Sequence, residues 1–188
     1  MPGQSWTYEF VAPEPGTHIY HCHFDTIRHA DRGMYGAIVV EPREGSVDDR
    51  EYTLILDEWD TRIDPLASPY QPEPNYFTVN GKAFPETQPL QVGRNEKVLV
   101  RLINMGYDVV TMHLHGNHFR VVATDGVPLP SPYVKDTLTF GPGERYDIEI
   151  LGDKTGTFPF HTHNLRQVTN DGTYPGGYLL PVEYLAGE

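Results

Sequence analysis

The sequence predicts an all-β protein built as an antiparallel sandwich or barrel. Strict alternation of polar and apolar residues over residues 144–150 is typical of a strand with one buried face. More continuous apolar runs at residues 97–103 and 51–56 predict strands that are more fully buried. Turn dipeptides such as Asn80-Gly81 and Asp125-Gly126 separate these runs. Many short strands joined by such turns favour a sandwich or barrel over a helical fold.

The remaining elements are shorter and follow from the same patterns. Pro142-Gly143 and Asp171-Gly172 mark two further turns. One short helix is expected over residues 25–31. Four further strands are expected at residues 6–11, 36–40, 118–123 and 136–140.

The chain divides near a polar, turn-rich segment at residues 42–49. The residues after it are numerous enough for a complete sandwich, whereas those before it are too few to bury a core alone. Residues 16–23 and 156–163 also resemble each other, because each segment starts Gly-Thr and ends His-x-His. We therefore expect two related domains, at 1–45 and 46–188, with the first represented only by its last strands.

Composition excludes several classes of protein. Apolar residues make up 38% of the 188, with 18 glycines and 17 prolines, which is a globular composition rich in turns. A formal charge of −12 without a basic stripe argues against nucleic acid as a partner. No apolar run approaches the length of a membrane span, so no membrane partner is expected. A single cysteine cannot form an intrachain disulfide.

The histidines are the strongest functional signal. Six of the nine fall in three His-x-His pairs, where a shuffled sequence would give roughly 0.4 such pairs. Imidazole and thiolate are ligands of copper, zinc and iron, and a structural zinc site would favour a richer set of cysteines. The pairs are His21/His23, which bracket Cys22, then His113/His115 and His161/His163.

Strand geometry gives each pair a common direction. Side chains alternate between the two faces of a strand, so both histidines of a pair share one side. Cys22 then points opposite to His21 and His23, toward the interior of its own domain. With a later histidine and a methionine, His29 and Met34, the cysteine forms the ligand set of a blue-copper electron-transfer site. Asp25 and Asp31 are expected to be solvated.

On these motifs the chain resembles the multicopper oxidases, specifically their two-domain laccase-like branch, which is related to copper nitrite reductases. The resemblance implies a cupredoxin-like Greek-key β-sandwich and copper as the cofactor. It also implies an extracellular or periplasmic location. By resemblance, Cys22, His29 and Met34 bind the type 1 copper, His113 the type 2 copper, and His21, His23, His115, His161 and His163 the type 3 coppers.

The chain departs from the family pattern in three places. Thr162 and Val110 stand where type 1 ligands would be, so the second domain is expected to lack that copper. His29 lies two residues further from Cys22 than in the commonest pattern. The family uses four His-x-His pairs and this chain has three, so we expect weak or no oxidase activity from it alone.

Three functions remain open at this point. The first is laccase-like oxidation of phenols or similar reductants, coupled to reduction of O2 to water, with Cys22, His21 and His23 as the electron path. In two-domain relatives the cluster lies between subunits of a homotrimer. The ligands that this chain lacks are therefore expected from a second copy of the chain or from a missing N-terminal segment. The second is copper nitrite reduction, which His23 disfavours. The third is a non-catalytic or split copper-binding fragment.

Overall fold

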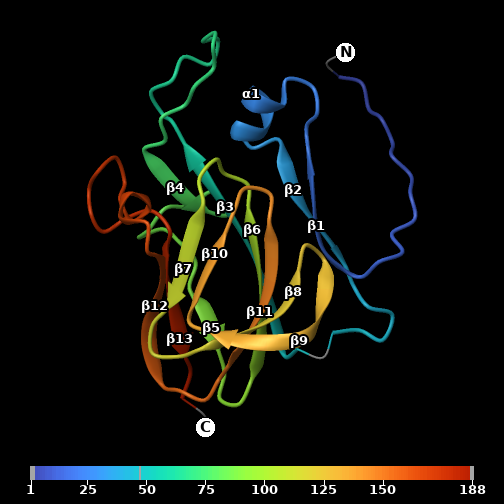
Figure 1. Cartoon of the computed structure of the whole chain (residues 1–188), viewed down its shortest axis with the longest axis vertical. Coiled ribbons are helices and arrows are strands. Elements are labelled where there is room, and N and C mark those ends of the chain that lie inside the picture. Colours follow the sequence, from blue (N-terminus) through green and yellow to red (C-terminus); the bar gives the residue numbers. More distant parts are fainter. Residues whose placement is uncertain (1–2, 47, 187–188) are drawn as a thin grey trace.

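The computed structural model describes residues 3–46 and 48–186, and nearly all of its regular structure is β (Figure 1). Two sheets form a sandwich, and a separate two-stranded hairpin lies outside it. Val47, in the expected linker, lies outside the described residues. The elements are β1 (Gly16–His21), α1 (Thr26–Asp31), β2 (Tyr35–Val40), β3 (Arg50–Trp59), β4 (Tyr76–Val79), β5 (Leu90–Val92), β6 (Lys97–Asn104), β7 (Val110–Leu114), β8 (Phe119–Thr124), β9 (Val127–Lys135), β10 (Thr137–Phe140), β11 (Arg145–Leu151), β12 (Gly156–Thr162), η1 (Leu165–Val168) and β13 (Leu179–Tyr184).

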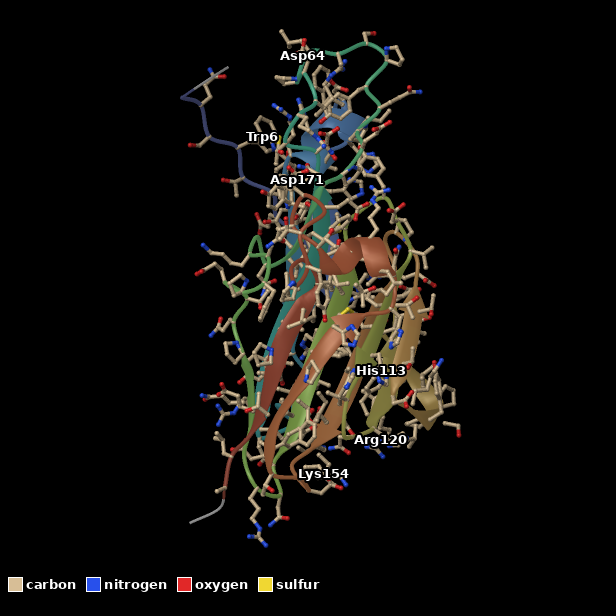
Figure 2. The ribbon with its side chains drawn as sticks, turned by 90° about the vertical axis from the view of Figure 1, so that its left-hand side faces the viewer. Trp6, Asp64, His113, Arg120, Lys154 and Asp171 are labelled. Atoms are coloured by element: carbon tan, nitrogen blue, oxygen red, sulfur yellow. The ribbon has the colours of Figure 1, made fainter. Side chains whose placement is uncertain are left out.

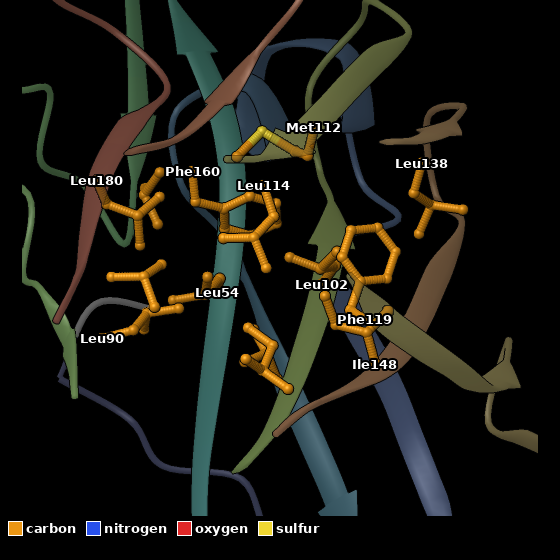
Figure 3. Packing of buried hydrophobic residues seen from close by; sticks show 14 of the residues in the cluster. Leu54, Leu90, Leu102, Met112, Leu114, Phe119, Leu138, Ile148, Phe160 and Leu180 are labelled. Atoms are coloured by element: carbon orange, nitrogen blue, oxygen red, sulfur yellow. The ribbon is translucent and has the colours of Figure 1, made fainter. Parts of the chain in front are cut away.

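The sandwich packs a six-stranded sheet against a five-stranded sheet. The first has the order β4-β3-β6-β11-β8-β9 and the second β10-β7-β12-β13-β5. Most neighbours are antiparallel, while β3 pairs in parallel with β6 and β13 with β5. The core between the sheets is apolar, with Leu102 and Ile148 from one sheet facing Leu114 and Phe160 from the other (Figure 3). This confirms the predicted all-β sandwich and excludes a closed barrel.

The β1–β2 hairpin covers the outer face of the six-stranded sheet. Arg101 in β6 alternates with core residues, so its side chain points away from the core. Thr17 of β1 accepts a hydrogen bond from Arg101 (3.0 Å) and donates one to Asp147 of β11 (2.7 Å). Leu99 and Ile103 are buried on this same outer face, outside the core cluster. The hairpin is therefore joined to the sandwich by a buried polar contact and by apolar packing.

One expected strand is absent. Residues 6–11 alternate in polarity, yet among the described residues they pair with no strand, and the Trp6 side chain is 82% exposed (Figure 2). Alternation makes a segment suited to a sheet edge, but a strand needs a partner to satisfy its backbone groups. The prediction at residues 6–11 was therefore wrong for this chain. The other expected strands and the helix occur within two residues of their predicted bounds, apart from β3, which continues to Trp59. No described helix has the length and apolar character needed to cross a membrane.

Candidate metal centre

Two neighbouring strands place four histidines on one surface. β7 pairs with β12 so that His113 lies directly opposite His161. Met112 and Phe160 on these strands are fully buried in the core, so the alternating histidines point outward from the five-stranded sheet. His115 and His163 follow at the ends of the same strands, and both side chains are exposed. The structure thus brings two of the three predicted pairs together. Figure 2 labels His113 of this group.

The four imidazoles are close enough to act together. The ring centroids of His113 and His115 are 4.8 Å apart, and those of His161 and His163 are 5.2 Å apart. Across the strands, the His113–His163 and His115–His161 distances are both 5.0 Å. The Nε2 atoms of His115 and His161 lie 2.9 Å from each other. We refer to these residues as the four-histidine set.

Hydrogen bonds fix which ring nitrogen is free in two members of the four-histidine set. His113 Nδ1 lies 3.0 Å from the backbone oxygen of Asp136 and 2.9 Å from Thr137 Oγ1. His161 Nδ1 lies 2.9 Å from the backbone oxygen of Thr162. A carbonyl oxygen only accepts, so both Nδ1 atoms carry the proton. In both rings Nε2 is therefore the nitrogen with a lone pair for a metal.

The protonation of the set also favours metal binding. Partial desolvation lowers the pKa of the largely exposed His115, and the neighbouring His113 and His163 lower it further. Burial likewise lowers the pKa of His161, although its bond to the Thr162 carbonyl opposes this change. A lowered pKa favours the neutral imidazole, which is the form that binds a transition metal.

The third pair lies on the outer hairpin with the cysteine. The rings of His21 and His23 stack with centroids 4.7 Å apart, so they share one side of the chain as predicted. Cys22 Sγ is 3.2 Å from His29 Nδ1. A tetrahedral metal with bonds of ~2.3 Å to sulfur and ~2.0 Å to nitrogen holds these atoms about 3.5 Å apart. The long spacing from Cys22 to His29 is thus accommodated by α1, which turns His29 back toward the sulfur.

The surroundings of Cys22 are more open than the sequence suggested. Cys22 and Met34 line one pocket of about 860 Å³, and the Met34 side chain is 54% exposed. Tyr20 and Phe24, which share the predicted inward face, are also exposed. Cys22 itself is only half-buried. In the part of the chain that the structure describes, its side chain faces a pocket and not a packed interior.

The expectation for Asp31 was wrong. Its side chain is buried and accepts a hydrogen bond from Tyr70, in the loop between β3 and β4. Burial raises the pKa of Asp31, while the contact with Tyr70 opposes the change. Polar residues on a short surface helix are usually solvated. Here the tertiary fold brings Tyr70 against Asp31, and the sequence gives no sign of this contact. Asp25 is exposed, as expected, and pairs with Arg28.

The two ligand sets lie on opposite faces of the sandwich. The four-histidine set is on the outer face of the five-stranded sheet, and the hairpin with Cys22 is on the outer face of the six-stranded sheet. The core separates the two faces, and no hydrogen bond or ring contact between described residues joins the sets. His21 and His23 therefore do not reach the four-histidine set of their own chain.

Both sets suit copper in ligand chemistry. Imidazole nitrogens and a thiolate are the ligands that copper takes, and the Nε2 atoms and Cys22 Sγ are available at suitable spacing. In the described part of the chain, however, no three His, Cys, Asp or Glu side chains converge on one metal position. The residues fit the metal, and closing a coordination shell around it requires further ligands or small movements.

Sequence reasoning missed Asp136, Thr137 and Gln167. Thr137 reaches His113 because β10 pairs with β7 and sets these two residues opposite each other. Gln167, which is fully buried, accepts a hydrogen bond from Thr162 Oγ1 at 3.0 Å. No motif spacing in the sequence marks these contacts, since they depend on strand pairing and on the turn after β12.

Comparison with known proteins agrees with this geometry. A multicopper oxidase family model matches residues 61–174, and a second multicopper oxidase model matches residues 1–45. The blue copper oxidase of Nitrosomonas europaea superposes with a TM-score of 0.88 at 34% identity, covering 97% of this chain and 60% of that one. The copper nitrite reductase of Nitrosomonas europaea superposes with a TM-score of 0.83 at 26% identity, covering 98% and 67%. Laccase-7 of Oryza sativa subsp. japonica is 33% identical over 171 residues, which are 80% of this chain and 30% of that protein.

The chain belongs to the multicopper oxidase family. It has the cupredoxin-like fold, and membership of the family implies copper as its cofactor, in type 1 and trinuclear sites. It spans less than half the length of curated relatives such as Laccase-7 of Oryza sativa and the copper-containing nitrite reductase of Neisseria meningitidis.

Proposed function

We propose that the protein is a laccase-like oxidase, which takes electrons from phenols or similar reductants and passes them to O2. The observation that carries this proposal is the pair of outward-facing ligand sets, one of which brackets a cysteine with two histidines. Copper, when bound, supplies one-electron redox chemistry and the four-electron reduction of O2 to water. Membership of the family supports copper-dependent oxidoreduction, and the laccase-like substrate is the further step proposed here.

In this proposal each residue keeps the role given by the resemblance. Cys22, His29 and Met34 hold the type 1 copper, and His113 holds the type 2 copper. His21 and His23 are joined to Cys22 by single peptide units, which gives electrons a short covalent path from the thiolate to both imidazoles. The type 3 coppers are held by His21, His23, His115, His161 and His163.

We further propose that the trinuclear site forms between subunits. His21 and His23 lie on the opposite face from the four-histidine set, so they meet a four-histidine set only on another copy of the chain. A head-to-tail contact of this kind forms a ring when its rotation closes, and a homotrimer is the ring that the resemblance to two-domain relatives implies. The first domain is taken as residues 1–45 and the second as residues 46–188. An extracellular or periplasmic location goes with this proposal.

Copper nitrite reductase is the second candidate, supported by the superposition with the Nitrosomonas enzyme. Such reductases lack a histidine directly after the cysteine. Here His23 occupies that position, and its ring stacks on that of His21. A single type 2 copper would also leave several members of the four-histidine set without a ligand role. These residues favour the oxidase.

Copper content and turnover together distinguish the candidates. The copper-loaded protein, as its natural full-length assembly, is expected to hold four coppers per subunit and to consume O2 with a phenolic donor. Replacement of His23 by Ala is expected to reduce the copper count and abolish O2 uptake. Nitrite reduction at two coppers per subunit would support the second candidate. Copper binding without either activity would support a non-catalytic role.

A further inference from the structure

Two hairpins of the chain have the same strand register and the same backbone hydrogen bonds at their histidine ends. β1 and β2 pair from Gly16–Val40 to His21–Tyr35, and β12 and β13 pair in the same register from Gly156–Tyr184 to His161–Leu179. In each, the first histidine of the pair places its Nδ1 on the backbone oxygen of the residue that follows. A short helix then leads into the returning strand, α1 in the first hairpin and η1 in the second.

This match identifies counterparts for all three cysteine-site residues. The amide of Cys22 donates to the Met34 carbonyl at 3.0 Å, and the amide of Thr162 donates to the Tyr178 carbonyl at 3.0 Å. The amide of Met34 donates to the His29 carbonyl at 2.9 Å, and that of Tyr178 to the Gln167 carbonyl at 2.9 Å. Cys22, His29 and Met34 therefore correspond to Thr162, Gln167 and Tyr178.

The three counterparts, Thr162, Gln167 and Tyr178, are held by hydrogen bonds and are fully buried. Thr162 Oγ1 donates to Gln167 Oε1 at 3.0 Å and accepts from the amide of Asn164 at 3.1 Å. Gln167 Nε2 donates to the backbone oxygen of Val109 at 3.3 Å, immediately before β7. Thr162, Gln167 and Tyr178 each have no exposed surface. Gln167 thus bridges β12, which carries one histidine pair, and the start of β7, which carries the other.

We propose that Thr162 and Gln167 are positioning residues for the four-histidine set. Their hydrogen bond does for His161 and His163 what a metal–thiolate bond would do for His21 and His23. It fixes the residue between the two histidines and so restrains the strand segment from which both imidazoles project. The bond from Gln167 to Val109 holds this pair in place relative to His113 and His115. This inference depends on the proposed function only in assigning a metal to the four-histidine set.

Removing the Thr162 hydroxyl tests the proposal. Zinc serves as the probe because it takes imidazole ligands and has no redox chemistry. The zinc-binding step that disappears in a His115→Ala variant is assigned to the four-histidine set, and its dissociation constant is the affinity compared between variants. Thr162→Val is expected to weaken this affinity ~10-fold, as loss of a partner behind the ligands usually does. Thr162→Ser, which keeps the hydroxyl, is expected to restore it.

A metal-free readout accompanies the zinc titration. The amide of His163 donates to the Thr111 carbonyl at 2.7 Å, and its hydrogen exchange reports the order of this strand end. Thr162→Val is expected to speed that exchange ~10-fold through local opening, and Thr162→Ser to leave it unchanged.

Thr78→Val is the matched control, because Thr78 is also buried and its hydroxyl also makes two hydrogen bonds, in the other sheet. It is expected to lower the melting temperature without changing either readout. Unchanged zinc affinity and exchange in Thr162→Val, or equal losses in Thr78→Val, would overturn the proposal. If the parent chain binds no zinc at the four-histidine set, the assignment of a metal to that set by this chain alone fails, and His163 exchange then decides the positioning role.

Discussion

The two His-x-His hairpins share one backbone plan, but they differ in what holds the central residue. In β12–η1–β13 that residue is Thr162, buried in the sandwich and tied to protein partners. In β1–α1–β2 it is Cys22, half-buried beside an open pocket, with the His29 imidazole 3.2 Å from its sulfur. One hairpin is thus organised by its own core, and the other presents a sulfur and a nitrogen suited to a metal. The same supersecondary unit serves as a scaffold in one place and as a ligand carrier in the other.

Truncating equivalent aromatic residues gives the largest expected difference between the hairpins. Phe160 and Tyr20 both precede the first histidine, but Phe160 is fully buried and Tyr20 is 55% exposed. Phe160→Ala is expected to lower the free energy of unfolding by about 3–5 kcal/mol, because it leaves a cavity in the core. Tyr20→Ala is expected to cost less than about 1 kcal/mol, as surface changes do. Urea denaturation measures both, and equal losses would contradict the contrast between the hairpins.

Thiol chemistry tests the same contrast at the central residue. Cys22 is accessible from its pocket, whereas a cysteine introduced by Thr162→Cys in a Cys22→Ser chain would be enclosed by the sandwich. Labelling of that buried thiol requires local unfolding, so it is expected to be at least ~100-fold slower than labelling of Cys22. An aromatic disulfide reagent followed by absorbance gives both rates, and the Cys22→Ser chain alone supplies the blank. Rates within a few-fold of each other would show that the second hairpin is as open as the first.

Local pattern predicted most strands of the fold correctly, because burial on one face leaves a period of two in the sequence. Residues 144–150 show this, and β11 occupies nearly the same span. Residues 6–11 have a similar pattern and form no strand, since pairing depends on a neighbour that the segment itself does not specify. A periodic segment is thus a candidate for a sheet, and only the rest of the fold decides whether it joins one.

The ligand residues were predictable for a different reason. His-x-His spacing directs two imidazoles to one side of any strand, so the four-histidine set needed only that β7 and β12 be neighbours. The supporting residues could not be predicted in this way. Thr137 acts through the pairing of β10 with β7, and Gln167 through a turn that reverses onto Thr162. Their roles are set by tertiary contacts that no local spacing records.

The junction between the outer hairpin and the sandwich gives an expected effect that depends on pH. Tyr35 of β2 donates a 2.6 Å hydrogen bond to Asp57 of β3. Burial raises the pKa of Asp57 from 3.8 to about 8, the bond from Tyr35 opposes the change, and the neighbouring Glu58 adds to it. The folded state therefore keeps a proton that the unfolded chain has lost. Stability is expected to fall as pH rises between about 4 and about 8, by up to about 1.4 kcal/mol per pH unit from this group.

Replacing Asp57 by Asn isolates that contribution. The amide oxygen still accepts from Tyr35 but does not titrate, so this variant is expected to lose part of the slope and to gain stability over the parent chain as pH approaches 8. Urea unfolding at intervals from pH 4 to pH 8 measures the difference between the two proteins, which cancels the other titrating groups. Parallel stability curves would show that Asp57 is already ionised in the folded state. The hairpin would then be attached to the sandwich through a charged contact, and its attachment would not weaken as pH rises through this range.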